Sequence, residues 1–224
     1  MSLIQLFAAM EVLAPVRLCY SDERLENCTY QGANMTTTSR WTSADLETLP
    51  DNGKRYEIID GELHVSKQPH WNHQVVCGQL FALLQAWNRT TTAGYANLAP
   101  GVIFADDEDV APDVVWISRA RLAASLAPDG KLHAAPELVV EVLSPGSLNE
   151  RRDREAKLKL YSRRGVHEYW IIDWRARQIE LYRREEQALH LVATLYEADT
   201  LQTPLLPGFA LSLANLFEDI AKDT

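Results

Sequence analysis

The chain has 224 residues, 46% hydrophobic and 24% charged, which is the composition of a globular protein long enough for one large domain. Its 22 Lys and Arg face 31 Asp and Glu, and the net charge of -9 opposes nonspecific adhesion to nucleic acid, although a local basic patch would still permit specific binding. The three cysteines form no C-x-x-C pair, and no apolar run reaches the roughly 18 residues that cross a bilayer, so we expect a cytoplasmic protein without a membrane segment.

The first 34 residues differ in pattern from the rest of the chain. They show no clean helical or strand period after Pro15, and a second methionine, Met35, precedes an ordinary polar chain start. Two interpretations stay open: residues 1–34 are a loosely attached, dispensable extension, or Met35 is the true start. Chain ends without a packing pattern are commonly poorly ordered, so we expect residues 1–34 to be poorly ordered or dispensable. We expect residues 35–224 to form a single domain.

The next part of the chain alternates between short helices and strands. Capping residues and an acidic first turn predict a short helix over residues 42–49, and the Asp60-Gly61 turn predicts a hairpin over residues 56–65. Helical spacing of apolar residues predicts an amphipathic helix over residues 71–88. Residues 95–105 are predicted as a strand broken at Pro100-Gly101, followed by an acidic turn over residues 106–109.

Two Val-rich runs, residues 114–117 and 138–143, are predicted as buried central strands. Residues 119–130 between them form a polar loop or a short helical connection. A helix over residues 149–164 leads to another buried strand, residues 168–173, which completes a strand-helix-strand unit. Strands over residues 178–183 and 189–196 and a terminal helix over residues 213–221 follow. This order predicts an α/β fold in which helices flank a mixed central β-sheet.

Charged residues on the predicted central strands need an explanation, because a carboxylate in a buried strand is costly unless it is paired or binds a cation. Asp113 heads one strand and Glu141 lies near the end of the other, so both can converge on one Mg²⁺ if these strands are neighbours. Lys157, on the following helix, could position or deprotonate a metal-bound water or stabilise charge on phosphorus. Glu57 supplies a third acidic group. The set suits metal-assisted phosphodiester hydrolysis.

Each of these residues also has a purely structural interpretation. Asp113 could be a turn or cap residue, Glu141 part of a structural ion pair and Glu57 a residue of the hairpin face. Lys157 lies four residues after Asp153, which is the spacing of a surface ion pair on a helix. The arginines of residues 151–154 could meet phosphate or be solvated. We assign Tyr161, Tyr169 and Trp170 to core packing. We assign His73, near the start of a helix, to capping or packing.

Six short motifs in order resemble one known family. They are the run from Arg55 to Glu62, then His73, then Pro112-Asp113, then the run from Glu141 to Pro145, then Asp153 with Lys157 and Tyr161, and last the run from Gly165 to Asp173. The pattern is similar to that of the Uma-two family of putative restriction endonucleases, within the PD-(D/E)XK nuclease superfamily. The resemblance covers the chain from about Arg40 to its end.

The resemblance implies a restriction-endonuclease-like core, DNA as the substrate and Mg²⁺ as the cofactor, with Mn²⁺ as the alternative ion. It implies an active-site set of Glu57, Asp113, Glu141 and Lys157, with the metal held by Asp113, Glu141 and the backbone carbonyl of Val142. The superfamily usually places a lysine two residues after the strand glutamate, where this chain has Leu143. In the Uma-two family that lysine lies on the following helix, and the long, flexible lysine side chain makes such a relocation chemically reasonable.

Three functions are therefore compared. The first is a Mg²⁺-dependent DNA endonuclease, which would act as a homodimer if it cuts both strands of a duplex. The second is a catalytically silent nuclease fold that serves as a nucleic-acid-binding or assembly module, which the net charge and the relocated lysine favour slightly. The third is a structural protein in which the same charges form buried pairs. The sequence leaves open whether DNA or RNA is the substrate.

Overall fold

The computed structural model describes residues 40–221, which lie in one compact unit, Ser39–Thr224. The proposed extension, residues 1–34, falls outside the described residues. Within residues 40–221, no helix combines the length and the apolar content that a membrane span requires.

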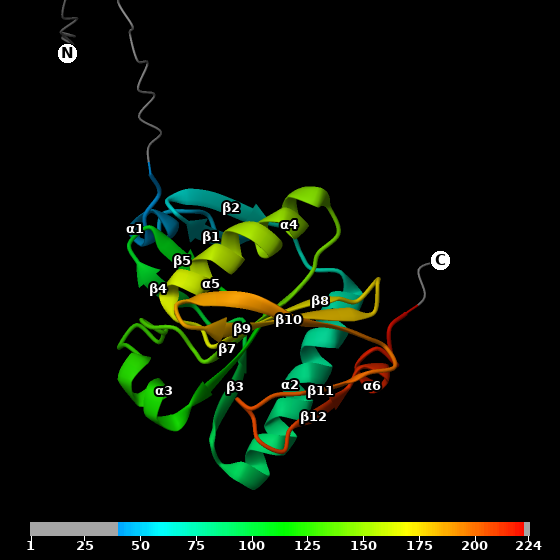
Figure 1. The fold of residues 1–224 in the computed structure, drawn as a ribbon. Coiled ribbons are helices and arrows are strands. Elements are labelled where there is room, and N and C mark those ends of the chain that lie inside the picture. Colours follow the sequence, from blue (N-terminus) through cyan, green and yellow to red (C-terminus); the bar gives the residue numbers. More distant parts are fainter. Residues whose placement is uncertain (1–39, 222–224) are drawn as a thin grey trace, which may run out of the picture. The chain divides into compact units, whose positions relative to one another are not determined.

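A six-stranded mixed sheet forms the centre of the unit (Figure 1). Its strand order is β10-β9-β8-β7-β6-β3, and only β7 and β8 run parallel; the other neighbours are antiparallel. The two predicted central strands, β6 and β7, are indeed neighbours. The bounds are β3 (Gly94–Leu98), β6 (Val114–Ser118), β7 (Leu138–Val142), β8 (Glu168–Asp173), β9 (Gln178–Glu185) and β10 (Ala188–Tyr196).

Hydrophobic residues cover both faces of this sheet, because successive side chains of a strand point to opposite sides. In β6, Val114 and Trp116 belong to the core that the long helix α2 (Trp71–Thr91) covers. Val115 and Ile117 belong to the second core, which α5 (Leu158–Arg164) covers. The predicted α/β fold with a mixed sheet flanked by helices is thereby confirmed.

The connection from β7 to β8 is helical from residue 147 to residue 164. It consists of α4 (Ser147–Arg151), a π-helical segment η1 (Arg152–Lys157) and α5. The predicted regular helix over residues 149–164 is thus interrupted by wider π turns, which are rare and often occur at functional sites. The helix ends at Gly165, whose φ of +87° is a left-handed conformation that glycine adopts without steric cost.

A smaller antiparallel sheet, of order β2-β1-β5-β4, lies beside α4 and α5 (Figure 1). The predicted hairpin is present, and Asp60 and Gly61 both have positive φ, as a type I′ turn requires. The predicted acidic turn at 106–109 is partly wrong, because Glu108 begins a strand and is buried against Arg163 and Arg164. The bounds are β1 (Arg55–Ile59), β2 (Glu62–Ser66), β4 (Val102–Ala105) and β5 (Glu108–Val110).

The remaining elements are short. The terminal helix predicted over residues 213–221 is limited to α6, Leu213–Leu216. Its continuation is replaced by hydrogen bonds of 3.0 and 2.9 Å between the Ala221 backbone and the Asn72 side chain, which hold this end on α2. The other elements are α1 (Ser43–Leu46), α3 (Arg119–Ser125), β11 (Thr200–Gln202) and β12 (Ala210–Ser212).

Candidate active site

Asp113 lies just before β6, at the point where β6 and β7 separate. Its Oδ2 accepts a hydrogen bond of 2.9 Å from the backbone N–H of Val142 and lies 3.1 Å from Nε2 of His73. Its Oδ1 accepts a hydrogen bond of 2.9 Å from Arg55. Burial alone would raise the pKa of Asp113, but the contact with His73 and the charge of Arg55 hold that pKa well below its ordinary value. Asp113 is therefore ionised.

Glu141 is the inward-facing carboxylate of β7. Like Val139 and Leu143, two residues away on either side, it points to the α5 face of the sheet. Its Oε1 accepts hydrogen bonds from Lys157 Nζ, at 2.9 Å, and from the Tyr161 hydroxyl, at 2.7 Å. Burial raises the pKa of Glu141 to about 8, because the attraction of Lys157 offsets only part of the desolvation.

Glu57 reaches the same place from β1. Its Oε1 lies 2.9 Å from Lys157 Nζ and accepts a hydrogen bond of 3.0 Å from the backbone N–H of Ala111. Burial opposes its ionisation, but Lys157 and Arg152 lower the pKa of Glu57 below its ordinary value. Its Oε2 is buried without a hydrogen bond, and Arg152 Nη1 is 3.9 Å away. Oε2 of Glu57 is therefore held by the charge of Arg152 alone, without a hydrogen bond.

Lys157 is completely buried, with a relative exposure of 0%. Its ammonium contacts Glu57 and Glu141 at 2.9 Å each, whereas Asp153 is 4.0 Å away. The interpretation of Lys157 as a surface ion pair is therefore wrong. Burial would lower the pKa of Lys157, but Glu141 and Glu57 raise it above its ordinary value, so the ammonium stays charged.

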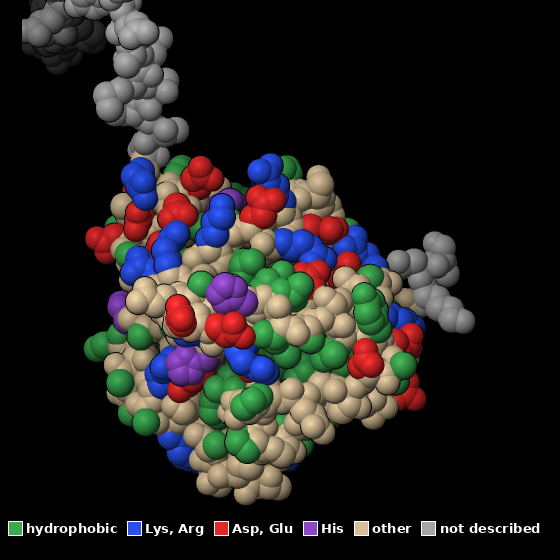
Figure 2. Space-filling model, in the orientation of Figure 1, with side chains coloured by type: hydrophobic (Ala, Val, Ile, Leu, Met, Phe, Trp, Pro, Cys, Tyr) green, Lys and Arg blue, Asp and Glu red, His purple; other side chains and the backbone are tan. Residues whose placement is uncertain are grey.

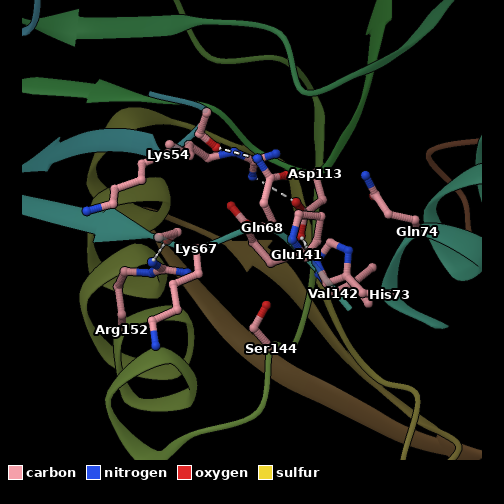
Figure 3. Close-up of a pocket in the computed structure, with 14 residues that line it drawn as sticks. Lys54, Lys67, Gln68, His73, Gln74, Asp113, Glu141, Val142, Ser144 and Arg152 are labelled. Carbon is pink, nitrogen blue, oxygen red and sulfur yellow. Dashed lines mark hydrogen bonds and ion pairs between the residues drawn. The ribbon is translucent and has the colours of Figure 1, made fainter. Parts of the chain in front are cut away.

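Asp113, Glu141 and Val142 line a pocket of about 310 Å³, whereas Glu57 and Lys157 are buried behind its wall. Figure 3 shows Lys54, Lys67 and Arg152 on one side of the pocket and His73 on the other, with the carboxylates between them. On the face of the molecule that Figure 2 shows, Lys and Arg lie among Asp and Glu. The pocket is therefore a local basic opening in an acidic protein.

Four participants were not assigned to the site by sequence reasoning. His73 was interpreted as a capping or packing residue, yet it contacts Asp113, and the N-cap of α2 is His70. Arg55 precedes Glu57 by two residues, so strand alternation could have placed both on one face. Arg152 gave a weaker signal, because its cluster at residues 151–154 is also compatible with solvated charge. Tyr161 is buried as expected but also donates a hydrogen bond to Glu141.

Two donor sets could hold a cation. Asp113, Glu141 and Val142 line one pocket and offer oxygen, and no hydrogen bond within residues 40–221 occupies Oε2 of Glu141. Oxygen donors suit Mg²⁺ and Mn²⁺, so these residues fit the expected cofactor. The second set, His73, Cys77 and Asp113, brings three ligand atoms within 4.8 Å of one another. Burial raises the pKa of Cys77, however, so its neutral thiol is a poor ligand.

Comparison with known proteins gives one family match and a similar solved fold. Residues 43–214 match the family described as putative restriction endonuclease, Uma2. A solved structure described as a putative nuclease of the DUF820 group from Anabaena variabilis is similar, with a TM-score of 0.64 and 18% identity, over 79% of this chain and 97% of that one. This similarity shows the fold. No curated protein matches the chain.

Proposed function

The chain belongs to the Uma2 family of putative restriction endonucleases, and from this we propose that it is a divalent-metal-dependent endonuclease that hydrolyses DNA phosphodiester bonds. One observation carries the proposal: Glu57, Glu141 and Lys157 meet from three separate elements, beside Asp113, at a pocket with basic side chains around it. Hydrophobic packing alone would not bring four buried charges to one opening. A phosphodiester substrate and a cation account for both the acidic floor and the basic rim.

In this proposal, Asp113, Glu141 and the carbonyl of Val142 hold Mg²⁺, with Mn²⁺ as the alternative. The bound ion would supply charge stabilisation to the scissile phosphate and lower the pKa of the attacking water. Lys157 lies behind Glu141, where its buried ammonium holds that carboxylate and stabilises charge developing on phosphorus. Glu57 holds the ammonium of Lys157 in place, and Tyr161 holds Glu141. The basic rim, Lys54, Lys67 and Arg152, receives the phosphates of the substrate strand.

The test is nicking of supercoiled plasmid by the wild type and by Asp113→Asn, which keeps the size of the side chain. The wild type should nick only with Mg²⁺ or Mn²⁺ and stop when EDTA is added, and Asp113→Asn should lose at least 100-fold in rate, roughly the effect of removing a group essential to transition-state stabilisation. Asp129→Asn, exposed and paired only with its own loop, is the matched control. Wild-type nicking no faster than that of Asp113→Asn, with both proteins folded, would overturn the proposal.

A second candidate, a catalytically silent nuclease fold, has its own support in the structure. Both oxygens of Asp113 already have partners, and Lys157 already pairs with both Glu141 and Glu57. Such a set needs no cation to fold. Calorimetric titration with Mn²⁺ separates the two candidates. The metal-dependent nuclease should bind Mn²⁺ and lose that binding in Asp113→Asn, whereas the silent fold should show no Mn²⁺ binding that depends on Asp113. A homodimer stays a prediction, and light scattering after size-exclusion chromatography checks it.

A further inference from the structure

A second pocket, of about 380 Å³, continues from the active-site pocket. The two pockets share four lining residues, which are Ser66, Lys67, Gln68 and Ser144. A nucleic-acid strand bound over one pocket would therefore reach the other without leaving the protein surface. Lys67 lines both pockets. The second pocket therefore lies beside the proposed cleavage site, in the direction in which a bound nucleic-acid strand would continue.

Free hydrogen-bonding atoms line this second pocket. Within residues 40–221, no hydrogen bond occupies the Ser144 hydroxyl, Oδ1 of Asn149, Oε1 of Gln68 or Nε2 of His70. The other polar atoms of the last three side chains are used for structure: Asn149 donates to the Pro145 carbonyl, Gln68 to the Gly53 carbonyl, and His70 accepts from the Asn72 backbone. These side chains are thus held in place while one polar atom of each stays available.

An aromatic platform completes the pocket. The His70 ring stacks on Trp174 with a centroid separation of 4.8 Å and an angle of 12°. Trp174 is buried and donates a 3.1 Å hydrogen bond to the Leu143 carbonyl, so the stack is fixed to the core. His70 itself is exposed and lines the pocket. Next to lining residues lie two unusually exposed apolar side chains, Trp71 at 74% and Leu148 at 83%.

We propose that this second pocket binds an unpaired nucleobase of the substrate strand, next to the scissile phosphate. The inference rests on the proposed function and narrows its substrate to nucleic acid with at least one unpaired nucleotide there. A planar base can extend the His70–Trp174 stack, and its polar edge can meet the free atoms of Ser144, Asn149 and Gln68. A base inside a duplex has both faces stacked and its pairing edge used, so it cannot enter a pocket in this way.

The test measures binding rather than cleavage, in EDTA, by fluorescence anisotropy of labelled oligonucleotides. The probes are a single-stranded 12-mer, its blunt duplex and a forked duplex with unpaired ends, in deoxy and ribo forms. The wild type should bind the single strand and the fork at least roughly tenfold more tightly than the blunt duplex. His70→Asn keeps a side-chain acceptor for the helix N-terminus but removes the ring, and it should lose roughly tenfold for the unpaired probes alone.

His190→Ala, on exposed β10, is the control and should bind like the wild type. Equal affinity for duplex and single strand, or a normal preference in His70→Asn, overturns the inference. The two proposals fail separately. Selective binding without metal-dependent cleavage of the forked duplex contradicts the nuclease proposal and leaves the pocket proposal standing. Efficient cleavage of blunt duplex by His70→Asn contradicts the pocket proposal and leaves the nuclease proposal standing.

Discussion

Replacement of Lys157 by methionine tests the electrostatic core of the site. The substitution keeps a long apolar side chain but removes the ammonium that lies 2.9 Å from both Glu57 and Glu141. Because both carboxylates and the lysine are almost fully buried, the variant leaves acidic groups in a low-dielectric interior without their counter-charge. Losing one partner of such a network costs about 3–5 kcal/mol of unfolding free energy.

The expected change in melting temperature follows from the size of the domain. At about 2–4 °C per kcal/mol for a domain of this length, Lys157→Met should melt roughly 6–20 °C below the wild type in a calorimetric scan at pH 8. The deficit should shrink at pH 5, because carboxylates with raised pKa values take up protons there and lose their repulsion. Lys159→Met, an exposed lysine two residues further along, is the matched control and should change little.

Added Mn²⁺ should restore part of the lost stability, because an ion bound to Asp113 and Glu141 supplies positive charge near the missing ammonium. Saturation at about 100 times the dissociation constant adds about 2.7 kcal/mol to the folded state. If Lys157→Met melts at the same temperature as Lys159→Met at pH 8, the buried carboxylates do not need the lysine, and Lys157 is not the electrostatic centre of the site. If Lys157→Met melts far below the wild type and Mn²⁺ does not raise its melting temperature, the buried ion pair is supported but the metal site is contradicted.

Three further outcomes are expected. Because the pKa of Glu141 is about 8, a cation that binds below that pH must displace the proton of Glu141. The affinity for Mn²⁺ should therefore rise about tenfold per pH unit from pH 6 to pH 8. A constant affinity in calorimetry would contradict this expectation. Arg55→Gln removes a cation from Asp113 and should tighten Mn²⁺ binding without DNA by roughly tenfold, and unchanged or weaker binding would argue against that ligand. Gly94→Ala places a methyl carbon 2.2 Å from the Ile117 carbonyl and should lower stability by about 1–3 kcal/mol, whereas Gly78→Ala, with nothing within 4 Å, should not; chemical denaturation compares them.

Periodicity recovered the main elements because burial follows local pattern. The runs 114–117 and 138–143 lie side by side as β6 and β7, and the crossover to β8 was correctly identified. The misassigned segments depended on distant partners. Glu108 lies in a buried strand, where Arg163 and Arg164 of α5 form ion pairs with it. The chain after α6 is held by a hydrogen bond from the Ala221 backbone to Asn72 of α2. Neither partner is visible from the neighbouring sequence.

The same distinction applies to the candidate site. Carboxylates in apolar runs are conspicuous in a sequence, so Asp113 and Glu141 could be singled out from their neighbours along the chain. His73 could not, because an imidazole at the start of a helix has several ordinary uses and only the fold brings it 3.1 Å from Asp113. The π-helical segment around Lys157 also escaped prediction, since its residues have the same apolar spacing as a regular helix over such a short length.

The hydrogen bond from the Val142 amide to Asp113 marks the point where β6 and β7 separate and the pocket begins. The β6–β7 ladder ends at the pair Val114 and Val140, and a side-chain carboxylate takes the next free amide of β7 in place of a backbone carbonyl. The two strands fork there, and the opening holds the candidate site. A slip of β7 by one residue would turn Glu141 to the α2 face and give its position to an apolar neighbour. Strand register therefore determines both where the cleft opens and which charges line it.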